Sequence, residues 1–271
     1  MRGLVQYIFT ATCLLAAVNG PVQVTGGPVD ANEGVFRAIP FAAPPTGDLR
    51  WKPPAPVAPW NGVRKPHKAA SDCMRPGAHG AEGSEDCLYL DVWPSSVHNS
   101  PVALLLPGPE GAAAIDASVL AKRGIVVVVA NSRTGLMGYL AHPDLSAESE
   151  TQTSGNYGLL DQMAALQWVS KNIVAFGGDP KNITVAGLAV PSKTPLAEAE
   201  KAGEAFALSQ NAHSMRYLRP MDAGDLVQAT VGEHFQPGLT GAPPPAIPGV
   251  NVLALPGNWA GLAAWADLFG R

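Results

Sequence analysis

The chain has 271 residues, of which 46% are hydrophobic and 15% charged, and its formal net charge is −4. This composition is typical of one α/β domain or two small domains with a sizeable core, and it excludes a disordered or fibrous chain. No run of lysines and arginines approaches the density that phosphate neutralisation requires. Nucleic acid is therefore not an expected partner.

The first 20 residues have the features of a cleaved signal peptide. Arg2 provides a positive start, residues 4–18 are mostly apolar, and small residues follow up to Gly20. The apolar stretch is too short to span a bilayer comfortably, and no later segment is long and apolar enough to do so. We therefore expect a secreted or periplasmic protein with no membrane association after cleavage, in which residues 21–271 form a single domain.

Two of the three cysteines, Cys73 and Cys87, lie outside the signal segment. In an exported protein an even pair favours a disulfide over a metal site, and two free buried thiols are the alternative. Such a disulfide would stabilise the fold by roughly 3 kcal/mol on the chain-entropy model. The sequence shows neither a metal-ligand cluster nor a glycine-rich phosphate loop after a strand, so no cofactor is expected.

The first expected elements follow the prolines and the apolar runs. Residues 21–60 are dense in proline, which predicts extended surface chain and turns and argues against helix. Residues 88–93 alternate in part and predict a short strand. The uninterrupted apolar runs at 102–106 and 125–130 predict strands that are buried on both faces, as in a parallel sheet.

A long helix is predicted next, because apolar residues recur at three- and four-residue steps and share one helical face. These residues are Leu159, Met163, Leu166, Val169, Ile173 and Phe176. Residues 177–180 should end the helix, and residues 183–186 predict another strand, which completes the strand–helix–strand pattern of an α/β fold. Further on we expect a helix at 197–208, a loop at 243–245, a strand at 250–255 and a closing helix at 259–269.

Several ordered segments carry a resemblance to a known family. They run from Gly34 to Pro45 with Leu49 to Trp51 after them, from Ser84 to Trp93, from Asn131 to Gly135, from Gly155 to Gln162 and from Phe176 to Pro180. In order and spacing they are similar to the type-B carboxylesterases, which are cholinesterase-like α/β-hydrolases, over about residues 22–187, and the remainder is degenerate. The resemblance implies a partial α/β-hydrolase fold, with a mostly parallel central sheet and flanking helices, that is shortened in its C-terminal half. It also implies that Cys87 pairs with Cys73.

The resemblance further implies where the catalytic groups would lie. Members of this family carry Gly-x-Ser-x-Gly after a strand, and the corresponding run here is Gly187-Leu188-Ala189-Val190-Pro191. Ala189 occupies the nucleophile position and has no atom that can attack a carbonyl. The oxyanion positions are Gly108, Pro109 and Val190, and Pro109 has no N–H to donate.

The remaining catalytic groups have no recognisable counterparts. The loop at 256–261 resembles the one that carries the family's catalytic acid, but it contains no carboxylate. His213 and His234 are the histidines of the second half, and neither lies in a context typical of a catalytic base. Ser192, beside Lys193, is interpreted as a solvated loop residue and not as a replacement nucleophile.

We therefore expect a carboxylesterase/lipase-family protein whose ancestral reaction is carboxylic ester hydrolysis, that is catalytically inactive, and that is retained for binding a small ester-like ligand or a protein partner. Two alternatives remain open, an active secreted ester hydrolase with displaced catalytic residues and a decaying gene product without function. Asn182 begins a glycosylation sequon, which is meaningful only in a eukaryotic secretory pathway. Arg133 and Asp161 are expected to be structural, and core packing is expected for Trp51, Trp60, Trp93 and Trp168.

Overall fold

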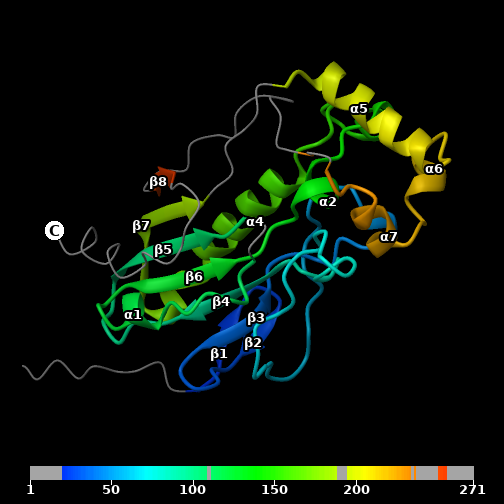
Figure 1. Cartoon of the computed structure of the whole chain (residues 1–271). Helices are drawn as coiled ribbons and strands as arrows, with labels where there is room; N and C mark the ends of the chain where they lie inside the picture. The colour runs from blue at the N-terminus through cyan, green and yellow to red at the C-terminus, as the bar shows by residue number, and fades with distance from the viewer. Residues whose placement is uncertain (1–19, 109–110, 188–193, 233–234, 236–249, 255–271) are drawn as a thin grey trace, which may run out of the picture.

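The computed structural model of the protein describes residues 20–108, 111–187, 194–232, 235 and 250–254. These residues form a six-stranded sheet of order β3-β4-β6-β5-β7-β8 and a separate two-stranded sheet, β1-β2 (Figure 1). The strands are β1 Val22–Val24, β2 Gly27–Val29, β3 Phe36–Pro40, β4 Tyr89–Trp93, β5 Ser100–Leu106, β6 Val126–Ala130, β7 Gly178–Gly187 and β8 Val250–Ala254. The predicted signal segment, the loop at 243–245 and the closing helix at 259–269 lie outside the described residues.

The large sheet is mostly parallel, as predicted. β6 pairs with β5, β5 with β7 and β7 with β8 in parallel, whereas β3–β4 and β4–β6 are antiparallel. Each strand predicted from an apolar or alternating run is present. β7 is longer than predicted because it begins at Gly178, and its first residues form an irregularity between the paired positions Gly178 and Ile183.

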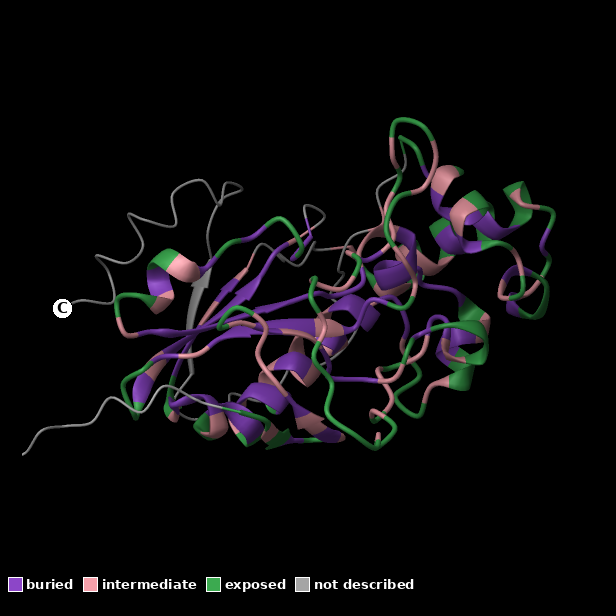
Figure 2. Ribbon diagram, turned by 90° about the horizontal axis from the view of Figure 1, so that it is seen from below, coloured by how far each residue is buried: buried purple, intermediate pink, exposed green. Residues whose placement is uncertain are grey.

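Successive side chains of a strand point to opposite faces of the sheet, and in the central strands both faces are buried. Leu104 of β5 packs in one core cluster with Trp168 of helix α4 (Tyr157–Asn172). Leu105, the next residue, packs in a second cluster with Leu120 of helix α1 (Ser118–Ala121). Helices therefore cover the two faces of the sheet, and the strands are buried along their length in Figure 2.

Helix α4 confirms the long helix that was predicted, but its buried face is rotated from the predicted one. Val169, Ile173 and Phe176 are buried, the last two in the short 3₁₀ helix η2 (Ile173–Phe176), whereas the more N-terminal members of the predicted stripe are only partly buried. Asp161 is buried on the inward side of α4, where it forms an ion pair with an arginine from the neighbouring loop, and the other buried residues of the helix are Tyr157, Gly158, Ala165, Trp168, Val169 and Asn172. Gly177 ends the helical segment with a left-handed φ of 85°.

The proline-rich segment 21–60 corrects another prediction. It is extended apart from the short 3₁₀ helix η1 (Gly47–Leu49), but it is not confined to the surface, since Phe36, Ile39 and Trp51 are fully buried. Proline is tolerated here because β3 lies at the edge of the sheet and pairs on one side only, with β4. The aromatic side chain of Trp60 is half-buried, and the other three tryptophans in the described residues pack in the core as predicted.

A group of helices lies beyond the arrowheads of β5 and β6 (Figure 1). They are α2 Gly135–Tyr139, α3 Pro143–Glu148, α5 Leu196–Ser209, α6 Met215–Leu218 and α7 Ala223–Gln228. Together with Trp51 they enclose a separate apolar core, and α5 confirms the helix predicted at 197–208. No helix in the described ranges is long and apolar enough to cross a membrane.

Two arginines fasten this helical group to the N-terminal segment. Arg50 donates to the carbonyl oxygens of Arg219 and Met221, each at 2.7 Å, and pairs with both carboxylate oxygens of Glu85. Arg219 in turn donates to the carbonyl oxygen of Arg50 at 3.2 Å and forms a two-point ion pair with Glu148. We call this reciprocal arrangement of Arg50 and Arg219 the arginine clasp. It joins parts of the chain that are 169 residues apart.

Candidate functional site

The strands β5 and β7, which precede two of the positions that the sequence singled out, end side by side. The two strands are parallel neighbours, and Leu106 pairs in register with Gly187. Gly108 and Ala189 are each two residues further along the chain, so both follow the same edge of the sheet. Ligands of open α/β sheets bind at this edge, outside the carboxyl ends of the strands.

Gly187 is required by the close approach of these strands. A Cβ atom at this position would lie 3.0 Å from Leu106 Cβ and 3.2 Å from the Leu106 carbonyl oxygen. A side chain there would push the end of β7 away from β5. Ala189, Val190 and Ser192 lie outside the described residues, as does Pro109 in the segment after β5.

The segment that follows β5 is closed by hydrogen bonds within the protein. Gly111 N donates to the Gly108 carbonyl oxygen at 3.1 Å. Ala112 N donates to Asn131 Oδ1 at 3.1 Å, and Ala113 N donates to Asp72 Oδ1 at 2.9 Å. All three successive N–H groups from 111 to 113 therefore already have acceptors and are not free to stabilise an external oxyanion.

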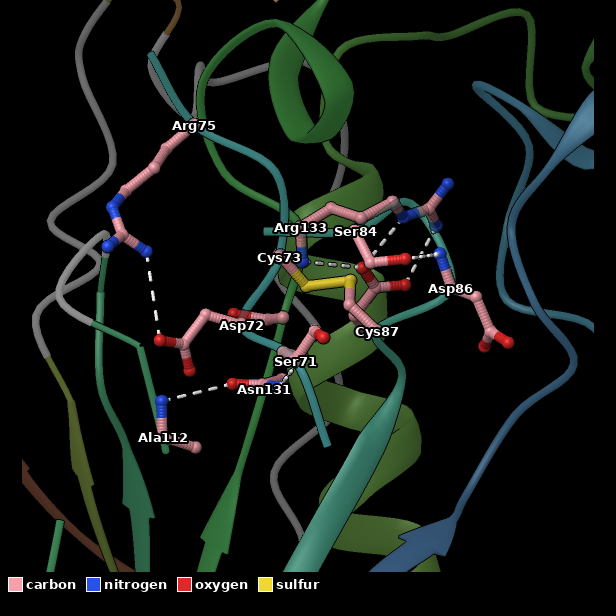
Figure 3. Close-up of a disulfide and its surroundings, with 12 residues drawn as sticks. Ser71, Asp72, Cys73, Arg75, Ser84, Asp86, Cys87, Ala112, Asn131 and Arg133 are labelled. Atoms are coloured by element: carbon pink, nitrogen blue, oxygen red, sulfur yellow. Dashed lines mark hydrogen bonds and ion pairs between the residues drawn. A yellow bond between two sulfur atoms is a disulfide. The ribbon is translucent and has the colours of Figure 1, made fainter. Parts of the chain in front are cut away.

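Asp72 and Asn131 connect this segment to the disulfide loop, as Figure 3 shows. The Cys73–Cys87 disulfide, which the sequence predicted, is present. Asp72 directly precedes it, and its carboxylate lies so close to Gly111 that a Cβ atom there would be 2.0 Å from Asp72 Cγ. Asn131, at the end of β6, donates through Nδ2 to the Ser71 carbonyl oxygen at 3.0 Å.

Sequence reasoning missed the roles of Asp72 and Asn131. Asn131 was noted only as part of a family-like run, and Asp72 was not singled out at all. The one available signal is that Asp72 stands next to a cysteine expected to form a disulfide. The residue that Asp72 contacts, Ala113, is 41 residues further along the chain, and the sequence gives no sign of that contact. Both side chains support the backbone beside the oxyanion position and neither is placed to act as a nucleophile.

A buried ion pair anchors the loop that follows β6. Arg133 Nε and Nη2 donate to the two carboxylate oxygens of Asp161 at 2.8 and 2.7 Å, and the Arg133 backbone N–H donates to the same group at 3.0 Å. Burial raises the pKa of Asp161, and the Arg133 guanidinium opposes this shift. The pair is structural, as the sequence predicted, and it fixes the N-terminal half of α4 to this edge of the sheet.

Candidate bases and alternative nucleophiles are not arranged for catalysis in the described residues. His213 is exposed, and His234 lies outside the described ranges. His142 is buried, but its Nδ1 accepts a hydrogen bond from Asp144 N and caps α3. Ser146 donates to Glu200 of α5, and within the described residues no serine hydroxyl is hydrogen-bonded to a histidine ring. This cluster, which the sequence did not reveal, attaches α5 to α3.

The largest cavity described has a volume of about 830 Å³ and lies at the N-terminal end of α4. Its apolar part includes Trp51, Leu145 and Tyr157, and carboxylates and hydroxyls of the segment 148–154 surround it. This volume is within the usual range for small-molecule sites, about 300–1,000 Å³. Groups of three or more potential metal ligands are absent from the part of the chain that the structure describes.

These features define the chain as a protein of the α/β-hydrolase class, with a mostly parallel sheet and the nucleophile and oxyanion positions after adjacent strands. The model of the carboxylesterase family matches residues 10–189, and the chain belongs to that family. The fumonisin B1 esterase of Sphingopyxis macrogoltabida is 46% identical over 66% of this chain and 37% of its own length. The cholinesterase of Mus musculus is 37% identical over 66% of this chain and 32% of its own length.

Solved structures agree with this relationship. The crystal structure of the Geobacillus stearothermophilus carboxylesterase aligns with a TM-score of 0.70 and 29% identity, covering 82% of this chain and 57% of that chain. A PNB esterase aligns with a TM-score of 0.71 and 30% identity, covering 81% of this chain and 57% of its own. The chain therefore spans about a third of the length of the curated relatives named above and little more than half of the solved structures.

Proposed function

We propose that this carboxylesterase-family protein does not hydrolyse esters and acts by binding. The observation that carries the proposal is Ala189, which stands where the family's nucleophilic serine is expected. An alanine methyl group cannot form an acyl-enzyme intermediate, and the described residues offer no serine–histidine pair in its place. The cavity beside Trp51 and Tyr157 supports a small ester-like ligand as the bound molecule.

The oxyanion segment supports the same proposal independently. Proline at position 109 has no N–H, and the next three described N–H groups, from Gly111 to Ala113, donate within the protein. Loss of a single oxyanion donor typically lowers the rate by about 10²–10³-fold. Restoring a serine alone should therefore leave turnover well below that of an intact esterase. Export to an oxidising compartment is part of the proposal, and the Cys73–Cys87 disulfide supports it.

The test is hydrolysis of a short-chain chromogenic ester by the purified protein, by the Ala189→Ser variant and by a heat-killed sample. We expect no turnover by the parent above the heat-killed control, together with a cooperative thermal transition in circular dichroism. Turnover by the folded parent would refute the proposal and favour an active hydrolase with displaced groups, for which Ser192→Ala is the next variant. An aggregated parent with no thermal transition would instead favour a decaying gene product.

A further inference from the structure

A second cavity lies between α4 and the proline-rich N-terminal segment. Its volume is about 220 Å³. Trp168 lines it and is 11 residues beyond Tyr157, where α4 begins, which corresponds to about 16 Å along the helix axis. The opposite wall belongs to the proline-rich segment, with Phe41, Pro54 and Pro56 among its residues. The cavity is thus separate from the larger one at the start of α4.

The helix side of this cavity presents hydrogen-bond donors. Trp168 is 3% exposed, and its indole N–H is buried without a hydrogen-bond partner among the described residues. Gln167 and Lys171, from the same part of α4, line the cavity as well. Gln167 and Lys171 are therefore the donors that a ligand in the cavity can reach, and the ring of Trp168 forms part of its wall.

The charge of the lining selects the kind of acceptor. Lys171 is the charged residue among those that line the cavity in the described ranges, and no aspartate or glutamate lines it. The described residues also provide Lys171 with no ion pair, whereas Lys65 is paired with Asp30. A cationic ligand would find no counter-charge there, while a carboxylate would find the ammonium group of Lys171 and the side-chain amide of Gln167.

We propose that this cavity binds a small monocarboxylate with a short hydrocarbon body. Its carboxylate would interact with Lys171 and the donors of α4, and its hydrocarbon would pack against Phe41 and the proline wall. The volume equals that of about seven waters at ~30 Å³ each, which sets the ligand at about seven non-hydrogen atoms. For a molecule of this size we expect a dissociation constant on the order of 1 mM.

The indole N–H of Trp168 gives a direct readout by two-dimensional nitrogen–proton NMR of the full chain. The chain has six tryptophans, and the Trp168→Phe variant identifies which indole signal belongs to this residue. Pentanoate, at neutral pH, is the probe, and pentanol and pentylammonium are the neutral and cationic controls. We expect pentanoate to shift the Trp168 signal saturably, and the two controls to have a much weaker effect.

Variants separate the contributions of charge and space. Lys171→Met should weaken pentanoate binding by up to about fivefold, the upper end of the range for one exposed charge interaction, whereas Lys201→Met on α5 should not change it. Ala164→Leu, which adds volume at the lining, should abolish the shift while the other indole signals keep their positions. The proposal is overturned if pentanoate causes no saturable shift, if pentanol or pentylammonium binds as well as pentanoate, or if Lys171→Met binds like the parent.

Discussion

Replacing Asp161 by alanine should cause a large loss of stability, because it leaves a buried cation without its counter-ion. Asp161 is fully buried, and it accepts hydrogen bonds from the backbone N–H and the guanidinium of Arg133. Removal of one partner of a buried ion pair typically costs about 3–5 kcal/mol. The free energy of unfolding of single domains is about 5–15 kcal/mol, so the variant should lose between about a fifth and all of its stability.

The assay is urea unfolding of the disulfide-intact protein, followed by circular dichroism at neutral pH. The double variant Arg133→Met with Asp161→Leu removes both charges and should unfold within about 2 kcal/mol of the parent, the remaining cost arising from the Arg133 backbone N–H. Asp225→Ala, at an exposed position of α7, is the control and should change stability by about 0.5 kcal/mol or less. A cost below about 1 kcal/mol for Asp161→Ala, or a double variant as unstable as the single one, would refute the assignment of a tightly coupled buried pair.

Three further outcomes are expected. Replacing both Cys73 and Cys87 by alanine should lower the free energy of unfolding by about 3 kcal/mol in urea, and an unchanged midpoint would contradict a constraining role for the disulfide. Gly177→Ala should cost about 1–2 kcal/mol in thermal unfolding because φ is 85°, and it should cost more than Gly124→Ala, since Gly124 has a similar φ of 82° but no atom near its missing Cβ. Burial raises the pKa of Tyr89 to about 12, so its contribution to stability is present below pH 10 and is lost as the pH rises from 10 towards 12. An absorbance titration at alkaline pH should therefore lose a late step in the Tyr89→Phe variant, and loss of a step near pH 10 instead would show that Tyr89 is solvated.

The strands of the sheet were predictable because burial on both faces leaves a simple mark in the sequence. Residues 102–106 and 126–130 are apolar throughout, and each forms a parallel strand with a helix on either side. The buried face of α4 was not predictable in the same way. Its inward position is occupied by a carboxylate, Asp161, whose burial depends on an arginine 28 residues earlier. Apolar periodicity contains no information about such a pair.

The candidate site also has one part that the sequence predicts and another that depends on contacts between distant residues. The nucleophile and oxyanion positions are implied by the family resemblance, and the pairing of Leu106 with Gly187 shows that the two strands preceding them end side by side at one edge of the sheet. The side chains that hold the oxyanion segment come from elsewhere, with Asp72 in the disulfide loop and Asn131 after β6. These contacts depend on the spatial order of strands, in which β6 and β7 lie on opposite sides of β5, and chain order alone does not reveal it.

Because of the arginine clasp, the link at residues 188–193 is a suitable place to insert the family's Gly-x-Ser-x-Gly sequence. Because Arg50 and Arg219 hold each other's backbone, α6 is attached to the start of the chain and not merely through the link at 188–193. The hydrogen bond from the Ser146 hydroxyl of α3 to Glu200 attaches α5 as well, at a point that precedes Arg219 in the chain. An engineer can therefore exchange the short link for a family-type sequence while the helices beyond it keep their own anchorage. Helices that are anchored independently of the segment 188–193 also allow its sequence to change with little effect on the stability of the fold beyond it.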